Sequence, residues 1–204
     1  MQDHTTEDEL KDRLSLIESM IAEGRRATES WGWIFLLWGV AYYAAIAWST
    51  WGQSAWAWPV TMVAAVIVTI VVSSLKVGNY PRTTLGRAIK SIWIALGISM
   101  FVLFLPLGLT GRLTDPHVFI SVAAAILGMA NGASGLLLRW KIQFACAIVW
   151  WAAAVASCFG TDEQSVIAGL AAIFLCQIVF GAYGMIAEAR ERKRRQALEG
   201  PAHA

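Results

Sequence analysis

The side chains that could carry out chemistry are few in this chain and lie far apart in the sequence. Three cysteines and three histidines are present, and neither set is clustered, which excludes most metal-site patterns. Ser134 is framed by glycines in the segment 132–135, but a serine becomes a nucleophile only with a base in hydrogen-bond reach. His4, His117 and His203 all lie outside the long apolar segments. We therefore expect Ser134 to be a packing residue, and we expect no catalytic residue, bound metal or cofactor.

Two amides are the strongest polar groups deep inside the apolar segments. Asn131 lies 13 residues after Val118 (131 − 118), and Gln177 lies 13 residues after Gln164 (177 − 164). If Val118 and Gln164 begin two helices at the same membrane face, the amides lie at one depth. A hydrogen bond between them would stabilise helix packing by about 0.6 to 2 kcal/mol. The functional alternative is a polar step that lines a pathway for an uncharged solute.

The elements that must position these residues are membrane-spanning helices. Apolar side chains make up 57% of the 204 residues and charged ones only 15%, and residues 30–75 contain no Asp, Glu, Lys or Arg. A bilayer core about 30 Å thick needs roughly 20 apolar residues per helix, and backbone groups in lipid must bond within their own helix. The sequence therefore predicts an all-α membrane protein with six spans, near 31–50, 56–75, 91–111, 118–138, 142–161 and 164–187.

The basic residues predict the orientation of these spans. The N-terminal tail and the second loop have four Lys or Arg each, the fourth loop has two and the C-terminal tail has five, which is 15 of 16. Short loops rich in Lys and Arg stay on the cytoplasmic side. We expect a multi-pass protein of the cytoplasmic membrane with both termini in the cytoplasm. Its parts would be a cytoplasmic segment 1–29, a transmembrane domain 30–187 and a basic tail 188–204.

The first 30 residues predict a short amphipathic helix outside the membrane. An apolar stripe with helical spacing (Leu10, Leu14, Ile17 and Ile21) indicates a helix over residues 6 to 23, with Gly24 as its end. So short a helix needs a cover for its stripe, and the net charge of −5 over residues 1–24 disfavours an anionic lipid surface. The candidates are the chain's own basic loop or tail, a second copy, or a cytosolic protein.

Small residues in the fourth span predict close helix packing. Ala124, Gly128 and Gly135 share a face with Asn131, and Gly128 and Gly132 form a GxxxG pair. The sequence does not identify the partner helix. The basic tail carries five basic residues beside acidic ones, too few for nucleic-acid binding.

Two short motifs resemble those of known membrane families. The run at 132–135 is similar to the GxSG motif of rhomboid intramembrane proteases, but the histidine that those enzymes need in the sixth helix is missing here. Residues 17–21 (IESMI) and 35–39 (FLLWG) resemble a group of small bacterial six-span membrane proteins with an acidic N-terminal helix. That resemblance implies bacterial origin and a cytoplasmic-membrane location, but no activity and no site residues.

These observations favour a non-enzymatic sensory, regulatory or scaffolding subunit that acts through protein contacts. An intramembrane enzyme or ion-coupled transporter normally keeps ionisable residues at depth, and this chain keeps none there. The contact surface would be the acidic N-terminal helix. The alternative is a channel or facilitator for a neutral or lipidic solute, with Asn131 and Gln177 along its route.

Overall fold

The computed structural model describes residues 3–54, 56–75, 84–112 and 115–199. These residues form helices, and none of them lies in a β-strand. The helices are α1 (Asp3–Glu29), α2 (Gly32–Gly52), α3 (Ala57–Leu75), α4 (Thr84–Leu109), α5 (Pro116–Leu137), α6 (Lys141–Phe159), α7 (Asp162–Ile173), the π-helix η1 (Phe174–Val179) and α8 (Phe180–Glu199).

The prediction of an all-helical fold is confirmed for the described residues. Six helical segments are long and apolar enough to cross a membrane, and the sixth is the continuous rod of α7, η1 and α8. The predicted span bounds hold within a few residues except at α4, which begins at Thr84 and not near Ser91, and at the last span, whose helix continues beyond residue 187 to Glu199. The first turns of α4 carry Arg87 and Lys90, because the helix extends beyond its apolar stretch.

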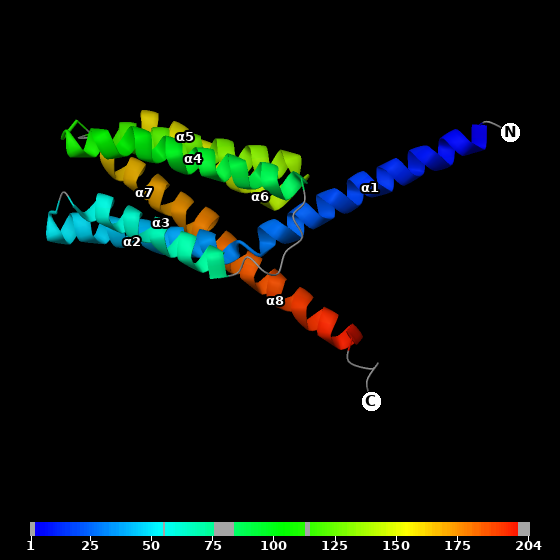
Figure 1. The fold of residues 1–204 in the computed structure, drawn as a ribbon. Helices are drawn as coiled ribbons and strands as arrows, with labels where there is room; N and C mark the ends of the chain where they lie inside the picture. Colours follow the sequence, from blue (N-terminus) through cyan, green and yellow to red (C-terminus); the bar gives the residue numbers. More distant parts are fainter. Residues whose placement is uncertain (1–2, 55, 76–83, 113–114, 200–204) are drawn as a thin grey trace.

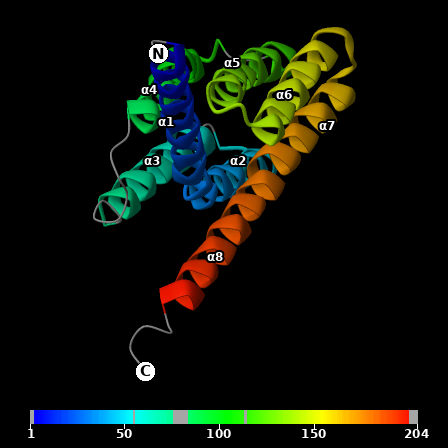
Figure 2. The same ribbon diagram turned by 90° about the vertical axis from the view of Figure 1, so that its right-hand side faces the viewer.

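Two helical hairpins and a long rod form the bundle (Figure 1). Helices α5 and α6 pack closely together, α2 packs against α3, and the rod contacts both hairpins through α7 and α8. Helix α4 lies against α5. Figure 2 shows α8 continuing well beyond the bundle, and Figure 1 places the start of α1 and the end of α8 at the same end of the molecule. We call this the terminal end, and the opposite one the far end.

An aromatic cluster joins α2 to the rod near the terminal end. Phe35 is buried and meets Trp93 and Phe180 edge-on, each at 5.0 Å between ring centroids. Phe180 also contacts Trp140, at 5.3 Å. Edge-to-face pairs of this kind add about 0.5 to 1.5 kcal/mol each beyond the area that they bury. The cluster therefore ties together helices from the first, third and last spans.

The outer surface of the bundle is apolar. Ile70 of α3 is 62% exposed and Val102 of α4 is 70% exposed. The apolar stretch of α4 that is long enough to cross a membrane contains no buried residue. Large continuous apolar surfaces are not stable in water. Lipid tails are the natural cover for them, so the chain is a multi-pass integral membrane protein.

Helix α1 does not end at Gly24 as the sequence analysis predicts. It continues to Glu29, because Gly24 serves close packing and not termination. A Cβ at Gly24 would lie 2.9 Å from both Leu85 and Leu138. The missing side chain lets α1 lie directly on the ends of α4 and α5.

Candidate functional site

The predicted contact surface lies on a helix that projects from the bundle. Figure 1 shows α1 extending away from the terminal end, with only its last turns against the other helices. Leu10, Leu14 and Ile17 are 60%, 53% and 51% exposed. Ile21 is partly buried, since it lies nearer the bundle. The described part of the chain therefore leaves most of this stripe uncovered. This is contrary to the predicted docking onto the basic tail, as far as the tail is described. Residues 76–83 of the second loop lie outside the described residues.

The same helix face is covered where it reaches the bundle. Gly24 and Thr28 follow Ile17 and Ile21 at seven-residue intervals, so all four lie along one face. Gly24 packs against α4 and α5, and Thr28 is 2% exposed. One continuous stripe is thus closed by the chain itself in its last turns and open in its earlier turns.

Arg25 fixes the direction in which this arm leaves the bundle. Its Nη2 donates hydrogen bonds to the carbonyl oxygens of Leu138, at 3.1 Å, and Arg139, at 2.9 Å. The last carbonyls of a helix have no partner within the helix and carry partial negative charge. A guanidinium at this point satisfies them and anchors α1 to the end of α5.

The two predicted amides are buried, but they do not bond to each other. Asn131 is 0% and Gln177 2% exposed. The Asn131 amide donates to the Leu127 carbonyl in its own helix, at 2.9 Å, and both side-chain carbonyl oxygens lack a partner. The prediction of a hydrogen bond between these two side chains is therefore wrong. Equal depth does not fix rotation about the helix axis. The Cβ of Gln177 lies against Gly39 of α2, where a Cβ added to the glycine would be 2.8 Å from it.

The π-helix around Gln177 is not predicted from the sequence. Gln177 and Cys176 lie in the π-helix η1, which interrupts the last span. The Cys176 thiol donates to the Cys146 carbonyl, at 3.4 Å. Gln143, three residues before Cys146, is 0% exposed and neither atom of its amide has a partner. A π-helix is often found at functional sites, but hydropathy carries no signal for it.

The glycine-rich face of α5 packs against α6 of the same chain. A Cβ at Gly128 or Gly132 would meet the Trp151 ring, at 2.4 and 2.9 Å, and one at Gly135 would meet the Phe144 backbone, at 2.7 Å. Ala124 is 1% exposed. The structure thus supplies the partner helix that the sequence does not identify.

Ser134 lies on this packed surface. It is 0% exposed, and its hydroxyl has no hydrogen-bond partner in the described structure. A serine without a base and without access to substrate has no means of activation. Its environment is that of a packing residue.

A polar cluster at the far end of the bundle was also missed. His117, in the first turn of α5, lies 2.6 Å from Asp162 Oδ1 through Nε2 and 2.8 Å from Ser165 Oγ through Nδ1. These three residue types form hydrolase triads, but Ser165 is 0% exposed and its hydroxyl also reaches the Ser157 carbonyl, at 3.3 Å. The cluster therefore holds helix ends together and does not present a nucleophile. No single segment signals it, because its members come from three helices.

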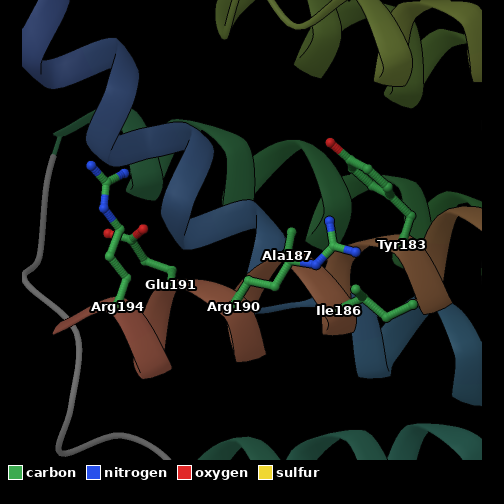
Figure 3. Close-up of a pocket in the computed structure, with 6 residues that line it drawn as sticks. All are labelled: Tyr183, Ile186, Ala187, Arg190, Glu191 and Arg194. Carbon is green, nitrogen blue, oxygen red and sulfur yellow. The ribbon is translucent and has the colours of Figure 1, made fainter. Parts of the chain in front are cut away.

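A hollow of about 430 Å³ lies at the terminal end, beside α8. It is lined by six residues: Tyr183, Ile186, Ala187, Arg190, Glu191 and Arg194. Figure 3 shows the tyrosine and both arginines pointing to the same side of α8, where α1 crosses. In the described residues, no group of three or more His, Cys, Asp and Glu side chains is arranged to hold a metal ion.

Comparison of the chain with protein-family models, curated proteins and solved structures gives no match.

Proposed function

We propose that this protein is a non-enzymatic sensory, regulatory or scaffolding subunit of the cytoplasmic membrane, and that α1 is its contact surface. The observation that carries the proposal is the exposure of Leu10, Leu14 and Ile17 on a helix that projects from the bundle. Full burial of one such side chain stabilises a complex by about 1.5 to 3 kcal/mol. A partner that covered all three would gain enough to bind specifically.

The cytosolic placement of α1 rests on the charge pattern. The connection after α5, with Arg139 and Lys141, lies at the terminal end with both chain ends. The loops expected at the far end carry Arg112 alone among the 16 basic residues. By the positive-inside rule the terminal end faces the cytoplasm. The contact surface would then be offered to soluble proteins.

A cytosolic protein fits this surface better than lipid or a second copy. The acidic character of α1 opposes an anionic leaflet. A second α1 lying parallel along the whole stripe would need the space that Leu85 and Leu138 fill beside Gly24. Copies held in one membrane present this helix in the same direction, so that obstruction applies to their natural pairing. The partner would contact the exposed turns of α1, and the contact would end where the bundle begins.

Site-specific photo-crosslinking in intact cells tests the proposal. A photoreactive residue replaces Leu14 or Ile17 on the stripe, or Leu16, which is 61% exposed but lies on a different face of α1. We expect one protein adduct from positions 14 and 17 and none from position 16. The substitution Leu14→Gln should then weaken the adduct formed at position 17, while Leu16→Gln should not. Lipid adducts alone, or the same adducts from all three positions, would contradict a protein-contact role.

A second function is favoured by the unpartnered amides. Polar atoms of Asn131, Gln143 and Gln177 lack partners inside the bundle, and a buried amide without a hydrogen bond costs about 1 to 3 kcal/mol. A channel or facilitator for a neutral solute would keep such groups along its route. Gln177→Leu should then abolish solute flux in vesicles and leave thermal unfolding unchanged. Absence of flux with the parent protein would rule out this function for the solutes tested.

A further inference from the structure

The hollow beside α8 is lined by two arginines and one acidic residue. Arg190 and Arg194 are four residues apart, both line the hollow, and neither has an ion pair within the described part of the chain. By contrast, Arg192 of the same helix pairs with Glu188, at 2.6 Å. Like charges four residues apart repel each other and destabilise a helix. An anion in the hollow would reduce that repulsion and accept hydrogen bonds from a lining guanidinium.

The hollow also crosses the boundary between the apolar and the charged part of the last span. No charged residue occurs from Gln164 to Ala187, and charges follow from Glu188 onward. Ile186 and Ala187 therefore line the apolar side, and the arginines line the charged side. A free anion would use only the charged side. An amphiphile with an anionic head and an apolar tail would use both.

The remaining lining residues are compatible with such a head group. The Tyr183 phenol is a hydrogen-bond donor, and it points to the same side of α8 as the arginines (Figure 3). Glu191 is the single acidic residue of the lining, and it lies near enough to Glu29 of α1 to act on it electrostatically. The two arginines outnumber it, so the hollow keeps a net positive charge.

We propose that this hollow binds the headgroup of one anionic phospholipid, with the phosphate on the side lined by Arg190 and Arg194 and the acyl chains along Ile186 and Ala187. The site differs from a diffuse basic surface because it depends on two particular arginines. It is separate from the open stripe of α1, so either proposal can fail without the other.

Native mass spectrometry of the full-length protein with phosphatidylglycerol as the probe tests this site. The variant R190Q/R194Q removes the two lining arginines. The matched control R192Q/K193Q removes the same charge from the same part of α8, at positions that do not line the hollow. We expect affinity for phosphatidylglycerol to fall roughly thirtyfold in the first variant and less than about threefold in the control. Ala187→Leu, which fills the apolar side without changing charge, should also weaken binding.

Three outcomes would overturn the proposal. Equal losses in both double variants would show that only the general positive charge of α8 attracts the lipid. Displacement of phosphatidylglycerol by inorganic phosphate would show that the hollow takes an anion and not an amphiphile. Failure of the parent protein to retain phosphatidylglycerol in preference to phosphatidylcholine would show that no such site exists.

Discussion

His117 Nε2 lies 2.6 Å from Asp162 Oδ1, and this contact joins the first turn of α5 to the first turn of α7 at the far end of the bundle. The other ring nitrogen, Nδ1, lies 2.7 Å from the Ser157 carbonyl oxygen, near the end of α6. One imidazole thus joins three helix ends, and Ser165 Oγ of α7 reaches the same ring nitrogen and the same carbonyl oxygen.

Replacing His117 should destabilise the bundle more than replacing Asp162. His117→Ala removes the ring from both the Ser157 carbonyl and the Ser165 hydroxyl, so it breaks the contacts of α5 with α6 and with α7 at once. The Asp162 side chain is 82% exposed, so Asp162→Asn should cost at most about 1 kcal/mol. Thermal unfolding of the two variants in detergent measures the difference. Equal losses would mean that the ion pair, and not the contact with α6, stabilises this end.

Gly32 should tolerate no side chain, because the obstacles around it are backbone atoms. A Cβ there would lie 2.6 Å from the Gly181 carbonyl oxygen and 2.7 Å from the Met185 nitrogen. Gly32→Ala must therefore push α2 away from α8. Overpacking of this kind costs about 1 to 3 kcal/mol. We expect a clear fall in melting temperature.

Gly97 provides the matched control for this substitution. It lies inside α4, and a Cβ there meets no atom within 4 Å. Gly97→Ala should be neutral or stabilise the helix by about 0.5 to 1 kcal/mol, because alanine loses less backbone entropy on folding. If both alanine variants behave alike, the close approach of α2 and α8 at Gly32 does not exist in the membrane.

The spans could be predicted because the signal for a span lies within about 20 consecutive residues. The extension of α1 past Gly24 could not. Glycine after a helical stripe is typical of a helix end, and only Leu85 and Leu138, far along the chain, turn it into a packing position. The local sequence pattern predicts a helix end at Gly24, whereas the tertiary contacts make Gly24 a packing position inside the helix.

The candidate sites show the same division. The stripe on α1 can be predicted from helical spacing alone, but which part of it is covered depends on where the bundle begins. The depth of Asn131 and Gln177 could be counted, whereas the direction of the Gln177 side chain depends on η1, which shifts the helix face after Phe174. The arginine pair at 190 and 194 is visible in the sequence as like charges four apart, and its hollow requires α1 and α8 to cross.

Glu29 makes stability depend on pH at the junction of α1 and the bundle. Burial raises the pKa of this carboxyl above its ordinary value of 4.5, and nearby Glu191 raises it further, while Arg25 and Arg26 partly offset the rise. The folded chain therefore binds this proton more tightly than the unfolded chain. The free energy of unfolding falls as pH rises from 4.5 through the raised pKa, and the full penalty is present above it.

The substitution Glu29→Gln should therefore stabilise the protein at neutral pH. The variant should melt above the parent at about pH 7.5, and the gap should close as the pH is lowered below the ordinary pKa. Glu18→Gln, on the exposed part of α1, should leave the melting temperature unchanged at both pH values. A variant that melts below the parent at neutral pH would mean that the attraction of Glu29 to Arg25 and Arg26 outweighs its burial.

Arg25 should control whether α1 stays attached to the bundle, whereas its neighbour Arg26 should not. Arg25 donates to two carbonyl oxygens at the end of α5, and Arg26 is exposed. Arg25→Gln removes donors that reach carbonyls otherwise left unsatisfied, at a cost of about 1 to 3 kcal/mol. Arg25→Lys should recover only part of this, because the lysine side chain is shorter and its ammonium does not reach both carbonyls that Nη2 meets. Hydrogen exchange of the last turns of α1 measures the attachment: we expect faster exchange in Arg25→Gln and parent-like exchange in Arg26→Gln. Equal acceleration in both variants would show that positive charge near Glu29, and not the bond to α5, holds this helix in place.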